Sequence, residues 1–318
     1  MNDIVELEGV ERLKKDLREA MIRGLQPSEV RYLVDIYYQT QKFRTRAANQ
    51  KRDAGKAGEP CELAAWTFTQ YESIEGSIKT ALEEWAKQNP VGRWSLSVYG
   101  IGPIISAGLL AHIDITQAPT VGHIWAFSGL DPTKKWNKAE KRPWNAKLKV
   151  ICFHIGESFC KFSGRDECYY CKLYLERKAY EIEKNVKGDY ADQCEVALKK
   201  TWKDGSNGVK WYGGCFPAEA YNHIATLSTE TARNNYLKSV EVPAGEGVPM
   251  LPPAHIDRRA KRWTTKLFLA HFHGVAFKEH YGTEPPLPYP ISYLPGHTHV
   301  IEPPAKATEG TNVEERQP

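Results

Sequence analysis

The sequence lacks the features of membrane, secreted and disulfide-rich proteins. No apolar run reaches the roughly 18 residues that a membrane-spanning helix needs. Residues 1–13 are acidic and amphipathic rather than basic and then apolar, so they do not resemble a secretory signal. The seven cysteines, an odd number at irregular spacings, argue against a disulfide framework. Together these absences predict a cytoplasmic protein without a membrane partner.

Strand patterns and internal repeats are also scarce. The 318 residues are 41% hydrophobic and 26% charged, an ordinary globular composition with enough apolar residues for a core. The formal net charge of +4 is only mildly basic. The total charge therefore does not indicate a nucleic-acid partner, and the distribution of the charges has to decide.

Helical periodicity dominates the N-terminal part of the chain. Residues 3–23 form an amphipathic pattern that stops at Gly24. A second helix is expected to begin at Pro27, whose fixed φ suits the first helical turn. A third is expected over 61–88 and ends before Pro90. These stripes predict core or coiled-coil-like packing, and we expect a homo-oligomer formed through these helices.

The stretch Gly100-Ile101-Gly102-Pro103 is a candidate phosphate-binding turn. A dinucleotide-binding fingerprint needs a third glycine where this chain has Ile105, and no strand pattern precedes the stretch. A helix-hairpin-helix fits better, because free N–H groups at the start of the following helix, and its positive dipole end, hold a DNA phosphate. A tight corner between two core helices is the alternative.

Residues 133–149 combine many cations and two tryptophans with a single acid, Glu140. Cations offset phosphate charge, and indole rings stack on exposed bases. A solvated surface loop would explain the lysines but not the tryptophans among them. We therefore expect DNA contacts from Lys134, Lys135, Trp136, Lys138, Lys141, Arg142, Trp144, Lys147 and Lys149.

A second basic element lies in residues 255–266. On a helix, its cations share one face while apolar residues share another. This pattern suits a helix resting on a phosphate backbone, and a solvated amphipathic helix is the alternative. The candidate DNA contacts are His255, Arg258, Arg259, Arg262 and Lys266.

Two groups of residues are of types that bind metals, and neither group predicts a metal site. Cys168 and Cys171 are spaced as a zinc half-site, but no second pair follows, so we expect buried helical cysteines. The histidines near the C-terminus include two pairs that diverge on a helix, and polar packing or nucleic-acid contact is the expected role. They are His271, His273, His280, His297 and His299.

The order of these motifs resembles a known family. GIGPIISAGLLAHIDI, TVGHIWAFSGLDP and NAKLKVICFHIGESF, within residues 91–180, are similar to the C-terminal helix-hairpin-helix domain of bacterial insertion-sequence transposases. Members of that family carry an N-terminal RuvC-like domain, and some are guided by a bridge RNA. The resemblance implies a DNA-handling role in transposition or recombination.

The chain departs from that family where catalysis is expected. Residues 1–90 show neither the strand nor the acidic residues of a RuvC-like domain. Between Pro132 and Lys149 there is no serine to match the family's nucleophile, and Thr133 is the only hydroxyl. The resemblance therefore implies retained DNA binding without a complete catalytic site, and no residue is assigned a catalytic role.

The sequence thus predicts an all-α, transposase-related protein that holds branched or bent DNA by phosphate contacts. A guide RNA or a separate catalytic subunit is an expected further partner. One alternative is an active transposase or metal-dependent nuclease with unrecognised catalytic residues, which would use Mg²⁺; without activity we expect no cofactor. The other alternative is an RNA-associated binding module.

Four regions follow from these patterns. The expected fold is a helical bundle with a helix-hairpin-helix core and a proline-rich extended strap. The regions are an N-terminal helical, coiled-coil-like part (1–90), a helix-hairpin-helix transposase-like domain (91–185), a C-terminal helical extension with a Pro/His-rich strap (186–302) and a disordered tail (303–318).

Overall fold

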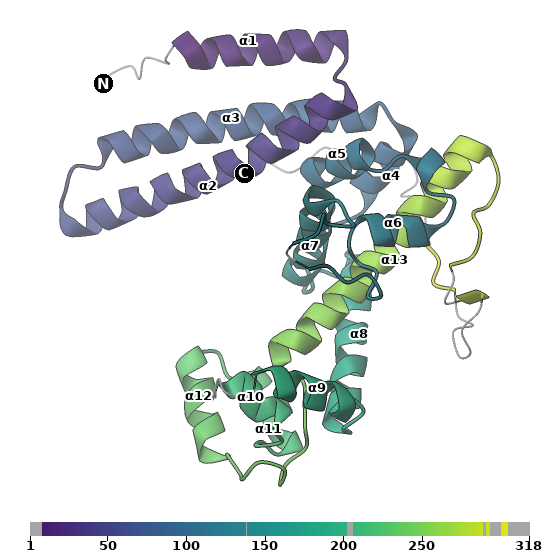
Figure 1. The fold of residues 1–318 in the computed structure, drawn as a ribbon. Helices are drawn as coiled ribbons and strands as arrows, with labels where there is room; N and C mark the ends of the chain where they lie inside the picture. The colour runs from purple at the N-terminus through teal and green to yellow at the C-terminus, as the bar shows by residue number, and fades with distance from the viewer. Residues whose placement is uncertain (1–7, 138, 202–205, 289–290, 293–299, 305–318) are drawn as a thin grey trace. The chain divides into compact units, whose positions relative to one another are not determined.

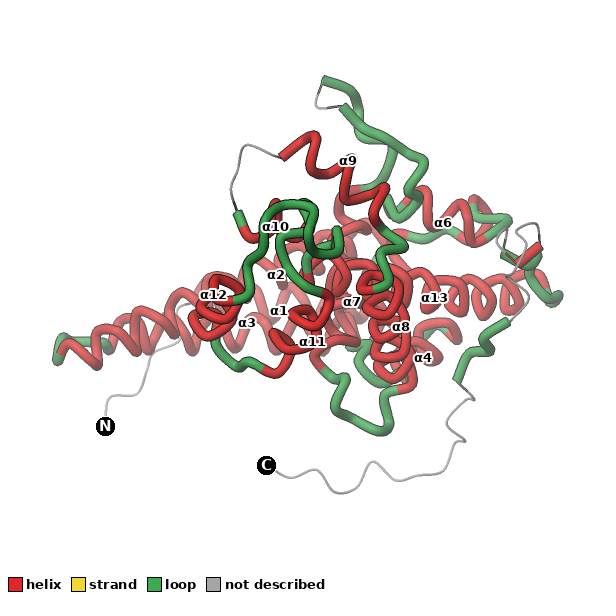
Figure 2. The backbone as a smooth tube through the Cα atoms, turned by 90° about the horizontal axis from the view of Figure 1, so that it is seen from below, coloured by secondary structure: helices red, strands yellow, loops and turns green. Residues whose placement is uncertain are grey.

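The structure, a computed structural model, describes residues 8–137, 139–201, 206–288, 291–292 and 300–304. Within these ranges the secondary structure is helical and contains no strand (Figures 1 and 2). The prediction of an all-α protein is confirmed. The expected DNA contact Lys138, the histidines His297 and His299, and the tail from residue 305 onward lie outside the described residues.

The chain divides into two compact units. The first comprises residues 1–158 and 266–318, and the second comprises residues 159–265. Two helices, α7 (Ala146–Lys161) and α13 (Pro253–Tyr281), contribute residues to both units.

Three long helices begin the first unit: α1 (Glu8–Arg23), α2 (Pro27–Ala57) and α3 (Glu62–Lys87). Helices α2 and α3 form a long antiparallel hairpin, and α1 packs against α3 (Figure 1). Gly24, at φ +89°, ends α1, and Pro27 is the first residue of α2, as the sequence predicts. The Trp85 indole donates to the Leu25 carbonyl at 2.9 Å, which ties the start of α2 to the end of α3.

The core of the first unit lies at the base of this hairpin. It is completed by α4 (Pro90–Ser97), α5 (Pro103–His112), α6 (Val121–Phe127), most of α7 and the second part of α13. Helix α4 lies so close to the end of α3 that a Cβ on Gly92 would come within 2.0 Å of the Ala86 carbonyl oxygen. Trp94 stacks on Phe268 of α13 with ring centroids 5.8 Å apart. A single shared core therefore fixes α4, α5 and α13.

Part of the expected C-terminal strap lies along α13. Residues 284–288 and 300–304 have neither helix nor strand structure. Nε2 of the buried His271 donates to the Ile301 carbonyl at 2.7 Å. Buried His273 likewise donates to the Ala118 carbonyl at 2.8 Å. Both histidines thus have hydrogen-bond roles in packing, in line with the expectation of polar packing.

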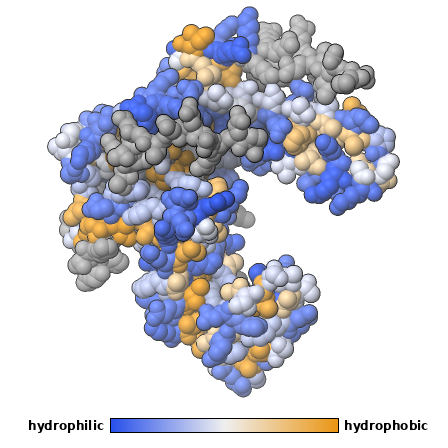
Figure 3. All heavy atoms as spheres, turned by 180° about the vertical axis from the view of Figure 1, so that it is seen from behind, coloured by the Kyte–Doolittle hydropathy of each residue, from blue (hydrophilic) through white to orange (hydrophobic). Residues whose placement is uncertain are grey.

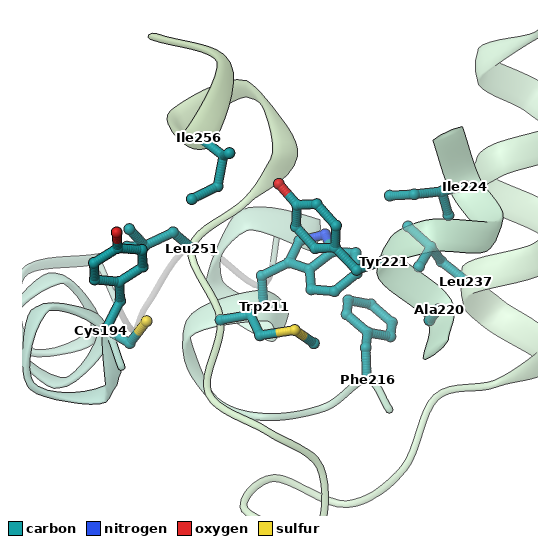
Figure 4. Close-up of a cluster of buried hydrophobic side chains, with 11 residues drawn as sticks. Cys194, Trp211, Phe216, Ala220, Tyr221, Ile224, Leu237, Leu251 and Ile256 are labelled. Atoms are coloured by element: carbon teal, nitrogen blue, oxygen red, sulfur yellow. The ribbon is translucent and has the colours of Figure 1, made fainter. Parts of the chain in front are cut away.

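The second unit is built from short helices around an aromatic core. They are α8 (Tyr169–Val186), α9 (Ala191–Thr201), α10 (Asn207–Tyr212), α11 (Ala218–Thr226), α12 (Glu230–Ser239) and the first part of α13. Trp211 lies at the centre, with Phe216 and Tyr221 packed on its ring at centroid distances of 4.6 Å and 5.5 Å (Figure 4). Ile256 of α13 and Leu251 cover this cluster.

The cysteine pair at the start of α8 corrects one expectation. Cys168 and Cys171 are joined by a disulfide, whereas the sequence predicted two buried thiols. Cys168 caps α8 and Cys171 lies in its first turn, so their Cα atoms are 5.1 Å apart, within the range a disulfide spans. The prediction that both are buried is confirmed, since each is fully inaccessible.

A buried carboxylate organises the charges of the second unit. The Glu181 side chain is 1% exposed. It accepts from Nε of Arg177 at 2.9 Å, from Nε of Arg259 at 2.6 Å and from the hydroxyl of Tyr190 at 2.6 Å. These donors outweigh burial and hold the pKa of Glu181 below its usual range. Helices α8 and α13 are thereby joined through one ionised group.

Removing this carboxylate tests its structural role. We expect Glu181→Ala to lower the free energy of unfolding by about 3 kcal/mol, because it leaves two guanidinium groups without their buried partner. Urea denaturation, followed by circular dichroism, measures the change. The matched control is Glu183→Ala on the same helix, which removes only an exposed pair with Lys187 and should cost at most about 0.5 kcal/mol. Equal losses in both variants would contradict the role of Glu181.

Candidate nucleic-acid interface

The glycine turn between α4 and α5 is anchored on one side and accessible on the other. Gly100 has φ +92°, a conformation that other residues rarely adopt. Ile101 is buried, and its N–H donates to the Val98 carbonyl at 3.0 Å. Gly102 caps α5, and a Cβ added there would meet no atom within 4 Å. Helix α5 then begins at Pro103, as the sequence predicts.

Helix α7 holds this turn in place. The Ser158 hydroxyl of α7 donates to the Gly100 carbonyl. The accessible side of the turn is therefore formed by the partly exposed backbone at Gly102 and Pro103, while Ile101 points into the core. This arrangement suits the helix-hairpin-helix interpretation, which stays a prediction.

Residues 133–149, which we call the basic loop and which include the first turn of α7, present their cations to solvent. The described lysines of this loop and Arg142 are all exposed: Lys134, Lys135, Lys141, Arg142, Lys147 and Lys149. Two of these cations lie over rings of the same loop. Arg142 is 4.7 Å from the Trp136 ring centroid, and Lys149 is 4.3 Å from that of Trp144.

Trp136 and Trp144 pack against each other inside the basic loop. Trp136 and Trp144 meet edge to face with centroids 6.3 Å apart, and both are partly buried. The Trp136 indole donates to the Glu140 carbonyl at 2.7 Å. At Gly129, which has φ +67°, an added Cβ would lie 2.9 Å from Trp144. The structure thus gives both indoles a packing role, and base stacking by them stays a prediction.

The basic face of α13 is divided between the two units. In the second unit, Arg258 and Arg262 are exposed, whereas Arg259 is committed to Glu181 and lies 4.4 Å from the Tyr190 ring centroid. Burial and the nearby arginines lower the pKa of His255. Of the four candidate DNA contacts in this unit, Arg258 and Arg262 therefore have exposed side chains.

The fifth residue of that face, Lys266, belongs to the first unit. Its ammonium lies 4.1 Å from the Trp125 ring centroid, and the Trp125 indole donates to its carbonyl at 3.1 Å. Burial lowers the pKa of Lys266, while Asp131 opposes the shift. Lys266 therefore packs on α6 rather than standing free in solvent.

Folding also creates a cleft that the sequence does not reveal. It has a volume of about 500 Å³ and lies among the start of α2, the ends of α5 and α6, and the start of α7. We call it the α2–α7 cleft; it is lined by Ser28, Arg31, Tyr32, His112, Phe127, Asn145 and Lys147. A neighbouring hollow of about 460 Å³ shares His112 and Lys147 with it and extends along α2. Lys147 is thus common to the basic loop and to the cleft.

Asn145 fixes the geometry of the cleft. Its Oδ1 accepts from the N–H groups of Lys147 and Leu148, both at 3.0 Å, and so caps α7. The backbone N–H of Asn145 donates to the Phe127 carbonyl at 2.8 Å. Because Oδ1 faces two N–H donors, the amide group Nδ2 must be the atom that lies 3.3 Å from Nδ1 of His112.

The protonation state of His112 follows from that contact. Asn145 Nδ2 donates, so His112 Nδ1 accepts and the ring carries its proton on Nε2. Burial, reinforced by the positive charge of Arg31, lowers the pKa of His112 to about 4. His112 is therefore a neutral residue with a single N–H donor at neutral pH.

Two cations stand on the walls of the cleft. Nη1 of Arg31 donates to the Ala111 carbonyl at the end of α5 at 2.6 Å, which holds the guanidinium in place. Lys147 pairs with Asp35 of α2, and both side chains remain partly exposed to water. No sequence motif groups Arg31 and Lys147 with His112, because the three residues lie far apart in the sequence.

Comparison with known proteins adds no relative: no family model matches the chain, and neither a curated protein nor a solved structure is similar to it. Among the described helices, none is both long and apolar enough to cross a membrane. The described residues also contain no cluster of three or more candidate metal ligands. On the face shown in Figure 3, hydrophobic residues occur in small groups among hydrophilic ones.

The depressed pKa of His112 predicts a loss of stability in acid. Since its folded pKa of about 4 lies below the ordinary histidine pKa of 6.5, the unfolded chain binds the proton more readily between these values. Its contribution is complete above pH 6.5 and falls as the pH drops toward 4.

The test is urea denaturation of the wild type and His112→Gln at pH 7 and pH 5. We expect the wild type to lose about 1 kcal/mol more than the variant over this interval, allowing for partial exposure of the ring. The other buried histidines titrate in both proteins and so cancel in the comparison. Identical losses would show that His112 is not held neutral by the fold.

Proposed function

We propose that the protein is a DNA-binding protein, related in its central part to insertion-sequence transposases, that acts in DNA transposition or recombination. It would hold branched or bent DNA by contacts with the phosphate backbone. A complete catalytic site of its own is not part of this proposal, and a guide RNA or a separate catalytic subunit would supply what is missing. The site of action would be the cytoplasm, where a disulfide such as that between Cys168 and Cys171 is rare.

The observation that carries the proposal is the concentration of exposed cations around the start of α7. The described cations of residues 133–149 are exposed, and the same segment contains one acid, Glu140. Lys147 continues this charge into the α2–α7 cleft, where Arg31 lies. Lysine and arginine side chains in such an arrangement displace the counterions of a nucleic-acid backbone, which favours binding without sequence preference.

The glycine turn supports the same conclusion. The start of α5 at Gly102 and Pro103 is partly exposed, and the positive end of a helix dipole attracts phosphate. Because α7 contacts the turn through Ser158 and begins beside the basic loop, one helix connects both elements of the first unit.

Salt-dependent binding to a branched DNA tests the proposal. We expect a four-way junction to bind more tightly than linear duplex, and its affinity to fall about 100-fold from 50 to 200 mM salt if four phosphates are contacted. Fluorescence anisotropy of labelled DNA measures both. Failure to bind either DNA at the lower salt concentration would overturn the proposal.

A charge-removal variant locates the contact. Replacing Lys134, Lys135 and Lys141 with Gln should weaken junction binding and reduce the slope of log affinity against log salt by about 2 to 3. The matched control replaces Lys51, Lys56 and Lys79, three exposed lysines of the α2–α3 hairpin, and should leave the slope unchanged. An equal effect of both triple variants would mean that the loop has no special role.

The absence of a complete catalytic site is tested separately. We expect junction DNA incubated with the protein and Mg²⁺ or Mn²⁺ to remain intact on a denaturing gel. Strand cleavage that copurifies with the protein would instead favour an active transposase or nuclease.

A further inference from the structure

The α2–α7 cleft has the size of a small-ligand site and an unusual lining. Its volume of about 500 Å³ lies within the roughly 300–1,000 Å³ of ordinary ligand pockets. Cations, neutral hydrogen-bonding groups and aromatic rings meet there, within one compact unit. This mixture matches a ligand that carries both an anion and a flat ring.

One part of the cleft suits an anion. Arg31 uses one of its five N–H donors to hold the Ala111 carbonyl, so its guanidinium is positioned before any ligand arrives. Lys147 lies on the α7 side, near the positive end of that helix. Asp35 balances Lys147 in the structure, which lowers the affinity of the cleft for anions but keeps the ammonium in place.

Another part suits an aromatic ring. Tyr32 is 64% exposed and Phe127 is 44% exposed, although both line the cleft. They differ in this from Trp136 and Trp144, which pack on each other. Exposed rings beside cations are typical of proteins that stack unpaired bases, an interaction that tolerates every base.

His112 and Asn145 complete the lining, and the contact between them fixes which ring nitrogen of His112 carries the proton. Asn145 keeps the His112 proton on Nε2, so the cleft wall offers an uncharged donor rather than a third positive charge. An uncharged donor suits the acceptor atoms of a base edge or a sugar.

We propose that the α2–α7 cleft binds one unpaired nucleotide of a DNA strand, with its phosphate at Arg31 and Lys147 and its base against Tyr32 and Phe127. This inference rests on the proposed DNA-binding function and names the part of the DNA that the cleft takes. A base in regular duplex has both faces covered by its neighbours, so only a branch, flap or end presents one. The cleft thereby gives a physical reason for a preference for branched DNA.

The experiment compares three DNAs by fluorescence anisotropy at low salt. They are a blunt duplex, the same duplex with a single-stranded overhang, and that overhang with abasic sites in place of its bases. We expect the wild type to bind the base-containing overhang about tenfold more tightly than the abasic one, because stacking requires the base. Equal affinity for the two overhangs would overturn the inference.

The variants separate stacking from charge. Tyr32→Ala combined with Phe127→Ala should remove the tenfold preference for the base-containing overhang over the abasic one, and Tyr32→Phe should retain the preference. The matched control is Phe153→Ala, an exposed ring on α7 that does not line the cleft. Loss of the preference in the control as well would contradict the assignment to the cleft.

The variant Asp35→Asn tests whether Lys147 contacts the phosphate, because a purely structural role of the Lys147–Asp35 pair does not predict tighter binding of the overhang. Removing this carboxylate frees Lys147 and should tighten overhang binding two- to fivefold, whereas Lys147→Ala should weaken it. Weaker binding by Asp35→Asn would contradict a phosphate contact at Lys147.

The outcomes also distinguish this inference from the proposed function. Failure of all three DNAs to bind overturns both. Equal binding of all three leaves the proposed function standing and overturns the cleft assignment. Free dAMP identifies the source of the nucleotide: if it binds the cleft as tightly as the overhang does, the ligand is a free nucleotide and the strand proposal is wrong.

Discussion

Asn145 joins three helix ends of the first unit through its side chain and its backbone. Its side-chain oxygen Oδ1 caps α7, and its side-chain Nδ2 contacts the ring of His112 at the end of α5. Its backbone N–H donates to the Phe127 carbonyl at the end of α6. Three helix ends therefore meet at one residue. The basic loop ends at this point, and the α2–α7 cleft opens beside it, so the positions of both depend on the same few hydrogen bonds.

Cations in this protein fall into two classes that the sequence does not separate. Arg259 and Arg177 neutralise the buried carboxylate of Glu181 and belong to the core of the second unit. Arg258 and Arg262, on the same helix as Arg259, remain exposed. Position along a helix predicts a shared face, but the partner of each charge is decided by residues that are distant in the chain. The buried pair of Arg259 with Glu181 has to break before this arginine contacts a phosphate, and the exposed Lys147 likewise has to leave Asp35.

Local patterns predicted most of the fold. Gly24 and Pro27 set the boundary between α1 and α2, and the helix expected over 61–88 is α3, which buries Ile78 and Leu82. These features depend on residues within a few turns of each other, which a sequence displays directly. The helical class and the start of α5 followed from the same kind of signal.

Long-range contacts were beyond such patterns. The disulfide between Cys168 and Cys171 was wrongly predicted as two thiols, because whether two close cysteines join depends on the turn that brings their side chains together. The packing of Trp136 on Trp144 was missed, since the loop folds back on itself. The cleft was missed because residues near 31, 112, 127 and 145 come together only in the folded unit.

DNA binding at the start of α7 is what the proposed function requires. Ultraviolet cross-linking of a four-way junction that carries 5-iododeoxyuridine at the branch, followed by peptide mass spectrometry, tests it most directly. We expect cross-linked peptides that contain Tyr32, Phe127 or residues 133–149. Cross-links confined to the tip of the α2–α3 hairpin, or to residues 206–250 of the second unit, would contradict it.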